Sequence, residues 1–186
     1  LVKGIAGLGN RMLAALTGVL YARLTGRILI IDWSDRTYSV DGTNAFPHLF
    51  HCPSCRSTED IPKTDSVLPA VWRDHLHESV ERLREPYGNN KEFWLMSSID
   101  MDSLDYSEDV LVMWTYIDKV EELRKHFKTD LSEFYQASRK EILSSLLRED
   151  LLLHPLIRKR VEEIKNNLLG GKTVGVHVRF TDHRAK

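Results

Sequence analysis

The sequence predicts an α/β protein, with a Rossmann-like, mainly parallel sheet flanked by helices. Two observations predict this class. Short apolar runs rich in β-branched residues alternate along the chain with segments whose apolar residues recur at helical spacing. In addition, residues 2–31 show the order strand, glycine-rich turn, helix and strand, which is the pattern of a βαβ unit with two parallel strands.

Glycines mark the boundaries of the βαβ unit. Residues 2–6 are expected to form a strand that is broken by Gly7-Leu-Gly-Asn10. Residues 11–24 carry a broad apolar stripe at helical spacing, and Gly26 is a natural C-terminal cap for that helix. The apolar run 27–31 is the second strand.

A long polar connection follows. Residues 34–66 are interrupted by glycine and proline and are expected to be irregular. Loops of this length are often functional. Two interpretations stay open for its aromatic and histidine side chains, which either pack on a sugar face or, as we favour, anchor the loop to the core: Tyr38, Phe46, His48 and Phe50.

The rest of the chain alternates between the two kinds of element. Residues 67–84 read as a helix, whose apolar face holds Val71, Trp72, Leu76, Val80 and Leu83. Strands are expected at 92–97 and at 110–116, and the second is almost wholly apolar, as is typical of a strand covered on both faces. Further helices are expected over residues 119–127 after a capping Asp118, over 132–147, and over 156–169 after Pro155.

Composition excludes several classes of protein. The chain has 186 residues, of which 42% are hydrophobic and 28% charged, and its formal net charge is −1. A general nucleic-acid-binding protein would carry a clustered basic excess. No apolar run approaches the roughly 18 residues of a membrane span.

The sequence indicates the extent and the cellular location of the protein less directly. The chain begins without a methionine and stops soon after its most polar motif, so we expect a piece of a longer protein. No Asn-x-Ser/Thr sequon occurs, which favours the cytoplasm of a bacterium and leaves the secretory pathway open.

The glycine turn is the first candidate site. Glycines between a strand and a helix let a ligand approach the backbone, and a helix N-terminus offers free N–H groups to an anion. Gly7, Gly9 and Asn10 are the residues concerned. Met12 occupies the third position of a dinucleotide fingerprint, so a dehydrogenase-type site is disfavoured, although Asp32 lies near the place of a ribose-binding acid. A tight turn without a ligand is the alternative.

The second candidate site lies near the C-terminus. Residues 173–178 form an apolar run that reads as a buried strand, and His177, Arg179 and Asp182 fall at its carboxyl end. Ligands of open α/β sheets bind beyond this end of the strands. The planar fork of an arginine matches phosphate oxygens. We therefore expect an anion site, for which a nucleotide diphosphate is the favoured ligand; the alternative is an ordinary ion pair at a solvated strand end.

Cys52 and Cys55 form a lone CxxC motif preceded by His51. Such a pair can be redox-active, half of a zinc site, or simply two thiols. Structural zinc sites need four ligands, and no second CxxC or paired-histidine motif follows. Free thiols or a local disulfide are therefore favoured over a metal.

The motifs at the two ends of the chain carry a resemblance. The C-terminal stretch Gly175-Val-His-Val-Arg-Phe-Thr-Asp182 resembles the His-Val-Arg-Arg-Thr-Asp segment of GDP-fucose-dependent fucosyltransferases of the α1,6, NodZ-like group. Gly7-Leu-Gly-Asn-Arg11 and the segments 21–27, 31–33 and 43–46 are similar to the start of the same enzymes. The chain departs from the family at Phe180, where the family has a second arginine.

The resemblance implies a GT-B architecture, in which two Rossmann-like domains face each other across a cleft. Residues 1–169 would then be the N-terminal, acceptor-side domain, and residues 170–186 the first strand and turn of the donor-binding domain. It also implies an inverting transfer of fucose from GDP-fucose to a sugar hydroxyl, for example of an N-acetylglucosamine unit, without an obligatory metal or other cofactor.

The resemblance further assigns roles to single residues. Arg179 would stabilise the departing diphosphate. The donor site would be lined by Gly7, Gly9, Asn10, His177, Arg179 and Asp182. The catalytic base stays unassigned, and the 186 residues alone are expected to lack transferase activity. The competing interpretations are a catalytically incompetent domain that binds a glycan or a protein, and another nucleotide-binding Rossmann-like domain.

Overall fold

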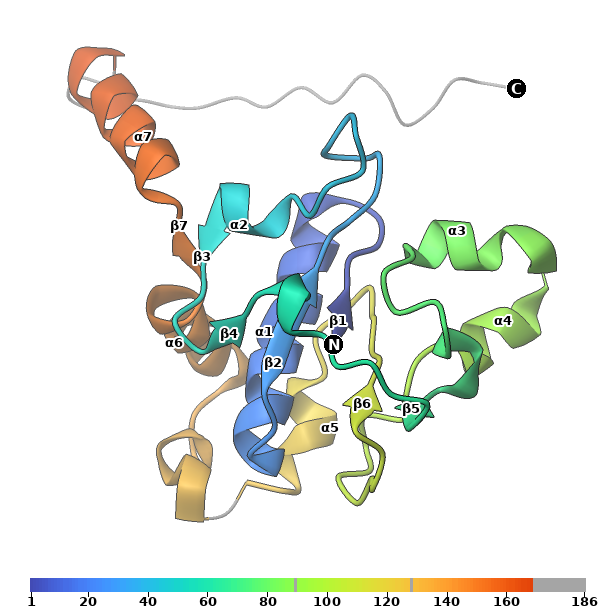
Figure 1. Ribbon diagram of the computed structural model, residues 1–186. Helices are drawn as coiled ribbons and strands as arrows, with labels where there is room; N and C mark the ends of the chain where they lie inside the picture. The colour runs from blue at the N-terminus through green and yellow to red at the C-terminus, as the bar shows by residue number, and fades with distance from the viewer. Residues whose placement is uncertain (89, 128, 169–186) are drawn as a thin grey trace, which may run out of the picture. The chain divides into compact units, whose positions relative to one another are not determined.

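The computed structural model describes residues 1–88, 90–127 and 129–168 (Figure 1). The chain divides into a first compact unit, Leu1–Leu152, and a second unit that begins at Leu153. The described part of the second unit contains the helix α7 (Pro155–Leu168), which confirms the helix expected after Pro155. The predicted strand 173–178 and its polar residues lie outside the described residues.

Parallel strands form the centre of the first unit. β1 (Val2–Lys3), β2 (Leu29–Asp32) and β4 (Cys55–Arg56) pair in the order β1-β2-β4, and both pairings are parallel. The predicted βαβ unit is thereby confirmed in its strand direction.

A second pair of strands extends this arrangement. β5 (Val67–Leu68) pairs in parallel with β6 (Val110–Leu111), and a parallel bridge joins Val2 to Met113, just after β6. The backbone N–H of Lys3 donates to Met113 O at 2.9 Å across this bridge. The strands therefore follow one another in the order β4-β2-β1-β6-β5, and the predicted α/β class with mainly parallel strands is confirmed.

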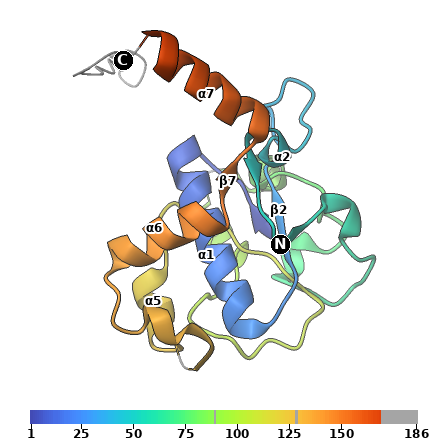
Figure 2. The same ribbon diagram turned by 90° about the vertical axis from the view of Figure 1, so that its left-hand side faces the viewer.

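One face of the strands is covered by α1 (Leu8–Thr25), outside which lie α5 (Val120–Arg124) and α6 (Arg139–Glu149) (Figure 2). Side chains of a strand alternate between its two faces. Leu29 and Ile31 accordingly join the apolar cluster under α1, whereas Ile30 joins a second cluster on the other face. Both faces are thus buried, as the apolar sequence of the strands predicts.

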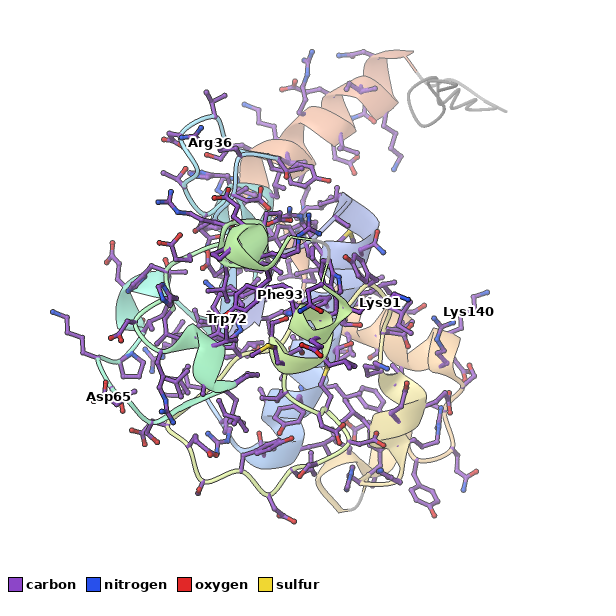
Figure 3. The ribbon with its side chains drawn as sticks, turned by 90° about the vertical axis from the view of Figure 1, so that its right-hand side faces the viewer. Arg36, Asp65, Trp72, Lys91, Phe93 and Lys140 are labelled. Carbon is purple, nitrogen blue, oxygen red and sulfur yellow. A yellow bond between two sulfur atoms is a disulfide. The ribbon has the colours of Figure 1, made fainter. Side chains whose placement is uncertain are left out.

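The opposite face is covered by η2 (Ala70–Trp72), α3 (Val80–Arg84) and α4 (Lys91–Met96). Trp72 and Phe93 are fully buried in this second cluster (Figure 3). The remaining short elements of the described chain are α2 (Phe46–Leu49), β3 (Phe50–His51), η1 (Thr58–Asp60), η3 (Glu85–Tyr87), η4 (Thr129–Phe134) and β7 (Leu152–Leu153).

The helix predicted over residues 67–84 is wrong. The segment instead holds β5, η2 and, only from Val80, a helical turn. Pro69 prevents a helix from running through this point because its ring clashes with the preceding turn, and Asp74 adopts a left-handed φ of 62°. Of the apolar residues expected on the helix face, Val71 is half-buried and the other four are buried, because periodicity reports which residues enter the core more reliably than which element carries them.

The strand predicted over residues 92–97 is also wrong. Helix α4 occupies this segment, and the Asn90 side chain caps it by accepting from Glu92 N at 2.9 Å. Phe93 is the only apolar residue of α4 that is fully buried, while Leu95 is 85% exposed. A short apolar run cannot be assigned to a strand or a helix by periodicity alone.

The polar connection is less irregular than predicted, since it contains α2, β3, β4 and η1. Phe46 and Phe50 are buried against the Trp33 ring, with centroids 5.0 and 5.8 Å from it. The anchoring interpretation is therefore confirmed for these two rings.

Cys52 and Cys55 form a disulfide, which was one of the favoured alternatives.

The later helices are present but shorter than predicted. α5 begins at Val120, whose N–H donates to the expected capping residue Asp118 at 3.4 Å. α6 begins at Arg139 instead of at residue 132 because Ser138 and Glu141 form a capping box at that point.

Candidate functional site

The glycine turn lies where the strand order reverses, between β1 and β6. Ligands of open α/β sheets bind in the crevice beyond the carboxyl ends of the strands at this place. The Asn10 side chain links the glycine turn to the segment after β6, because its Nδ2 donates to Tyr116 O at 2.7 Å. Gly7 precedes α1 as its N-cap and, having no side chain, makes no side-chain cap to the first-turn N–H groups.

Helix α1 begins at Leu8, earlier than the predicted residue 11. Gly9 and Asn10 lie in the first turn of α1, not in a loop, and Ala6 is the residue with a left-handed φ, 58°. A Cβ at Gly9 would meet no atom of the described residues within 4 Å. Neither strain nor packing therefore requires glycine at position 9, which leaves open space in front of the helix N-terminus.

Arg11 is a site residue that sequence reasoning missed. Its side chain is fully buried, its Nε donates to Ala6 O at 3.0 Å, and its guanidinium forms an ion pair with Asp35. The exposed Tyr38 ring lies 4.8 Å from the guanidinium carbon. Arg11 therefore ties the glycine turn to the loop after β2. The one signal for it in the sequence is its place at the end of the family-like Gly7-Leu-Gly-Asn-Arg11 segment.

A second buried ion pair lies beside the first. Lys3 Nζ is 2.6 Å from Asp32 Oδ2 and donates to Leu76 O at 2.5 Å. Burial lowers the pKa of Lys3, while the Asp32 carboxylate opposes this shift. Asp32 is 3% exposed and its other oxygen accepts from Ser34 N at 2.9 Å. Asp32 is therefore a structural residue and not a free ribose-binding acid.

A polar cavity of about 640 Å³ opens beyond the carboxyl end of β2. One wall is the loop of residues 34–42, and the other is formed by residues 77–85, which include α3. Arg36 lies in the first wall (Figure 3). The two buried cations fix these walls, since Arg11 binds Asp35 in the first wall and Lys3 holds the carbonyl that precedes His77 in the second.

Another hollow of about 330 Å³ lies at the amino ends of the strands. Its lining is mainly apolar and includes Ile28, Ile61 and Pro62. Polar side chains line the 640 Å³ cavity at the carboxyl edge, and a further hollow of about 440 Å³ is lined by Lys63, Asp65 and Asp74.

The described residues offer no cluster of three or more His, Cys, Asp or Glu side chains that could hold a metal ion. In the same part of the chain, no helix combines the length and the apolar character that crossing a membrane requires. His177, Arg179 and Asp182 lie outside the described residues, so the geometry of the predicted donor motif stays a prediction.

The chain is similar to Nodulation protein Z of Azorhizobium caulinodans. The two are 26% identical over 193 aligned positions, which cover 93% of this chain and 50% of the relative. The chain thus spans about half the length of the curated relative that it matches. No family model and no solved structure matches it.

Proposed function

We propose that this chain is the acceptor-side part of a GT-B fucosyltransferase, which transfers fucose with inversion from GDP-fucose to a sugar hydroxyl. The observation that carries this function is the similarity to Nodulation protein Z over 93% of the chain. Parallel strands, with their polar side chains gathered at the carboxyl edge, are compatible with it.

The chemistry required is the departure of a nucleoside diphosphate. In a reaction without an obligatory metal, cationic side chains and oriented N–H groups must stabilise the developing negative charge. On this proposal Arg179 and its neighbours His177 and Asp182 bind the donor from one side. Gly9 and Asn10, at the uncapped start of α1, face the transferred sugar from the other.

A domain that binds a glycan without catalysis is the second candidate. It is favoured by the preformed polar cavity beyond the carboxyl end of β2. A dehydrogenase-type site is not proposed, because both oxygens of Asp32 are engaged inside the protein.

The test compares the 186-residue chain with a longer chain that extends past Lys186. Both are incubated with labelled GDP-fucose and a chitin oligosaccharide, and labelled product is measured. We expect the longer chain to transfer fucose and the 186 residues to show no turnover. A longer chain that neither binds GDP-fucose nor transfers fucose would overturn the proposed function.

A further inference from the structure

We propose that the helix α7 is a docking surface for a partner helix, whose apolar stripe is bordered by carboxylates. The inference does not rest on the proposed function. It is carried by the burial and the charge pattern of α7 alone.

In the described structure, α7 lacks the packing that normally stabilises a helix of its length. None of the residues 155–167 is buried there, whereas the helix α6 buries Ile142 and Leu146 completely. Isolated helices shorter than about 12–15 residues are marginal in water, and helices in proteins gain most of their stability by packing an apolar face. The 14 residues of α7 are therefore expected to have a partner.

An apolar stripe marks the face of α7 that such a partner would cover. We define this α7 stripe as Ile157, Val161 and Ile164. Val161 is 47% exposed, Ile164 is 39% exposed and Ile157 is half-buried. Their spacing of four and then three residues places them on one side of the helix. It is also the spacing of the a and d positions at which two helices pack together in a coiled coil.

Basic side chains border the α7 stripe on both sides. With Val161 at an a position and Ile164 at a d position, Arg160 occupies the neighbouring g position. Arg158 and Lys165 occupy the e positions on the other side. The charged residues at the border of the stripe are therefore all basic.

The two carboxylates of α7 lie away from the stripe. Glu162 and Glu163 fall at the outer b and c positions of the same heptad. Glu162 pairs with Lys165 at 3.8 Å and Glu163 with Arg160 at 3.2 Å, but both cations are largely exposed. Exposed ion pairs of this kind contribute little to stability. Lys165 and Arg160 can therefore exchange these partners for carboxylates of another helix at small cost.

The basic border selects the partner. If two copies of α7 packed stripe against stripe, basic residues at the e and g positions would face one another, and like charges there are destabilising. A helix with glutamate or aspartate at these positions would form ion pairs with the same border. Charge complementarity therefore favours an acidic amphipathic helix over a second copy of this chain.

A membrane surface fits α7 less well than a helix does. Helices that lie in the interface of a bilayer present a large apolar face, with residues such as Trp, Phe and Leu. The α7 stripe is a single row at a and d spacing, and α7 contains no aromatic residue. So narrow a stripe is typical of the seam between paired helices.

Two designed peptides test the proposal, each of about three heptads with leucine at every a and d position. One peptide has glutamate at the e and g positions and the other has lysine, so that like charges keep each peptide from pairing with itself. Binding of the fluorescently labelled peptides to the 186-residue chain is measured by anisotropy at low salt. We expect the glutamate peptide to bind about tenfold or more tightly than the lysine peptide.

A matched pair of substitutions tests the stripe. Ile164→Ser should weaken binding of the glutamate peptide about tenfold or more, because an apolar contact is lost. Isoleucine and serine have similar helix propensities, so this loss does not come from unfolding of α7. Leu156→Ser is the control, because Leu156 is 71% exposed but lies at an outer position away from the stripe, and its affinity should stay within about twofold. Equal affinities of the two variants would overturn the docking surface.

A charge reversal tests the border. Arg160→Glu combined with Lys165→Glu should invert the preference, so that the chain binds the lysine peptide more tightly than the glutamate peptide. Lys159→Glu is the control, since Lys159 lies at the outer f position, and it should keep the preference for the glutamate peptide. A preference that the double reversal leaves unchanged would refute the charge complementarity.

Three other occupants of the stripe are outcomes of the same test. A dimer in analytical ultracentrifugation that Ile164→Ser abolishes, without peptide binding, would overturn the proposal and assign a second copy. Binding to phosphatidylglycerol vesicles that Ile164→Ser abolishes, without peptide binding, would overturn it and assign a lipid surface. The longer chain that extends past Lys186 should also bind the glutamate peptide, whether or not it transfers fucose. Binding by the 186 residues that is lost in the longer chain would show that the rest of the protein covers the stripe, which would refute the proposal.

Discussion

Replacing Gly18 by alanine should destabilise the protein, although alanine is the better residue in the middle of a helix. A Cβ at position 18 would overlap Cγ2 of Val2 and lie 3.2 Å from Cδ1 of Leu29. Both neighbours are buried residues of β1 and β2, so neither can move aside without disturbing the sheet. The gain in helix propensity is about 1 kcal/mol. Overpacking of a core costs about 1–3 kcal/mol. The direct overlap with Val2 places the cost in the upper half of that range, about 2–3 kcal/mol, so the net loss is about 1–2 kcal/mol.

Gly9 provides a control in the same helix. A Cβ there meets nothing within 4 Å and the position is exposed, so Gly9→Ala should leave stability unchanged or raise it by up to about 1 kcal/mol. Urea unfolding followed by circular dichroism gives both free energies of unfolding. If Gly18→Ala were as stable as the unmodified chain, α1 would not pack on the two strands as closely as the structure shows.

Three further outcomes are expected. Arg11→Met should lower the free energy of unfolding by about 3–5 kcal/mol in urea titrations because it leaves the buried Asp35 charge unpaired, whereas a loss below 1 kcal/mol would contradict the buried pair. The hydrogen bond from Arg139 lowers the pKa of Asp118 below its usual 3.8. The ionised Asp118 therefore stabilises the fold fully above pH 3.8, and this contribution is lost as the pH falls through the lowered pKa. The stability difference between the unmodified chain and Asp118→Asn should shrink between about pH 7 and strongly acidic pH, and a constant difference would refute the assignment. In the longer chain, Arg179→Lys and Arg179→Ala should both reduce kcat by about 10²–10³, which steady-state kinetics would measure, and near-normal turnover of the lysine variant would contradict a bidentate contact.

The parts of the fold that follow from local pattern were predictable. The glycine turn, the helix stripe and the apolar run before Asp32 define a βαβ unit by themselves. The apolar run at 110–116 likewise predicted a strand, although β6 covers only Val110–Leu111 and is shorter than predicted. Residues 67–84 show that helical spacing of apolar residues does not by itself establish a helix. Their apolar residues recur at helical spacing and enter the core, yet Pro69 and the left-handed Asp74 break the chain into shorter pieces.

The candidate site was less accessible to prediction because its parts meet only through tertiary structure. The sequence marks the glycine turn but gives no sign that Arg11 and Lys3 are buried, since a charged residue is normally exposed and its partner cannot be read from spacing. The polar cavity exists only because α3 lies opposite a loop some forty residues earlier in the chain. Such a contact leaves no periodic signal.

The central claim is that the carboxyl edge of the parallel strands is the edge that receives a sugar. Amide chemical shifts of the isotopically labelled 186-residue chain, recorded while N,N′-diacetylchitobiose is added, test it most directly. We predict that the perturbed amides lie in residues 34–42 and 77–85, which wall the polar cavity. Perturbations confined to the apolar hollow around Ile28 and Pro62, at the opposite ends of the strands, would contradict the claim, as would no perturbation at all.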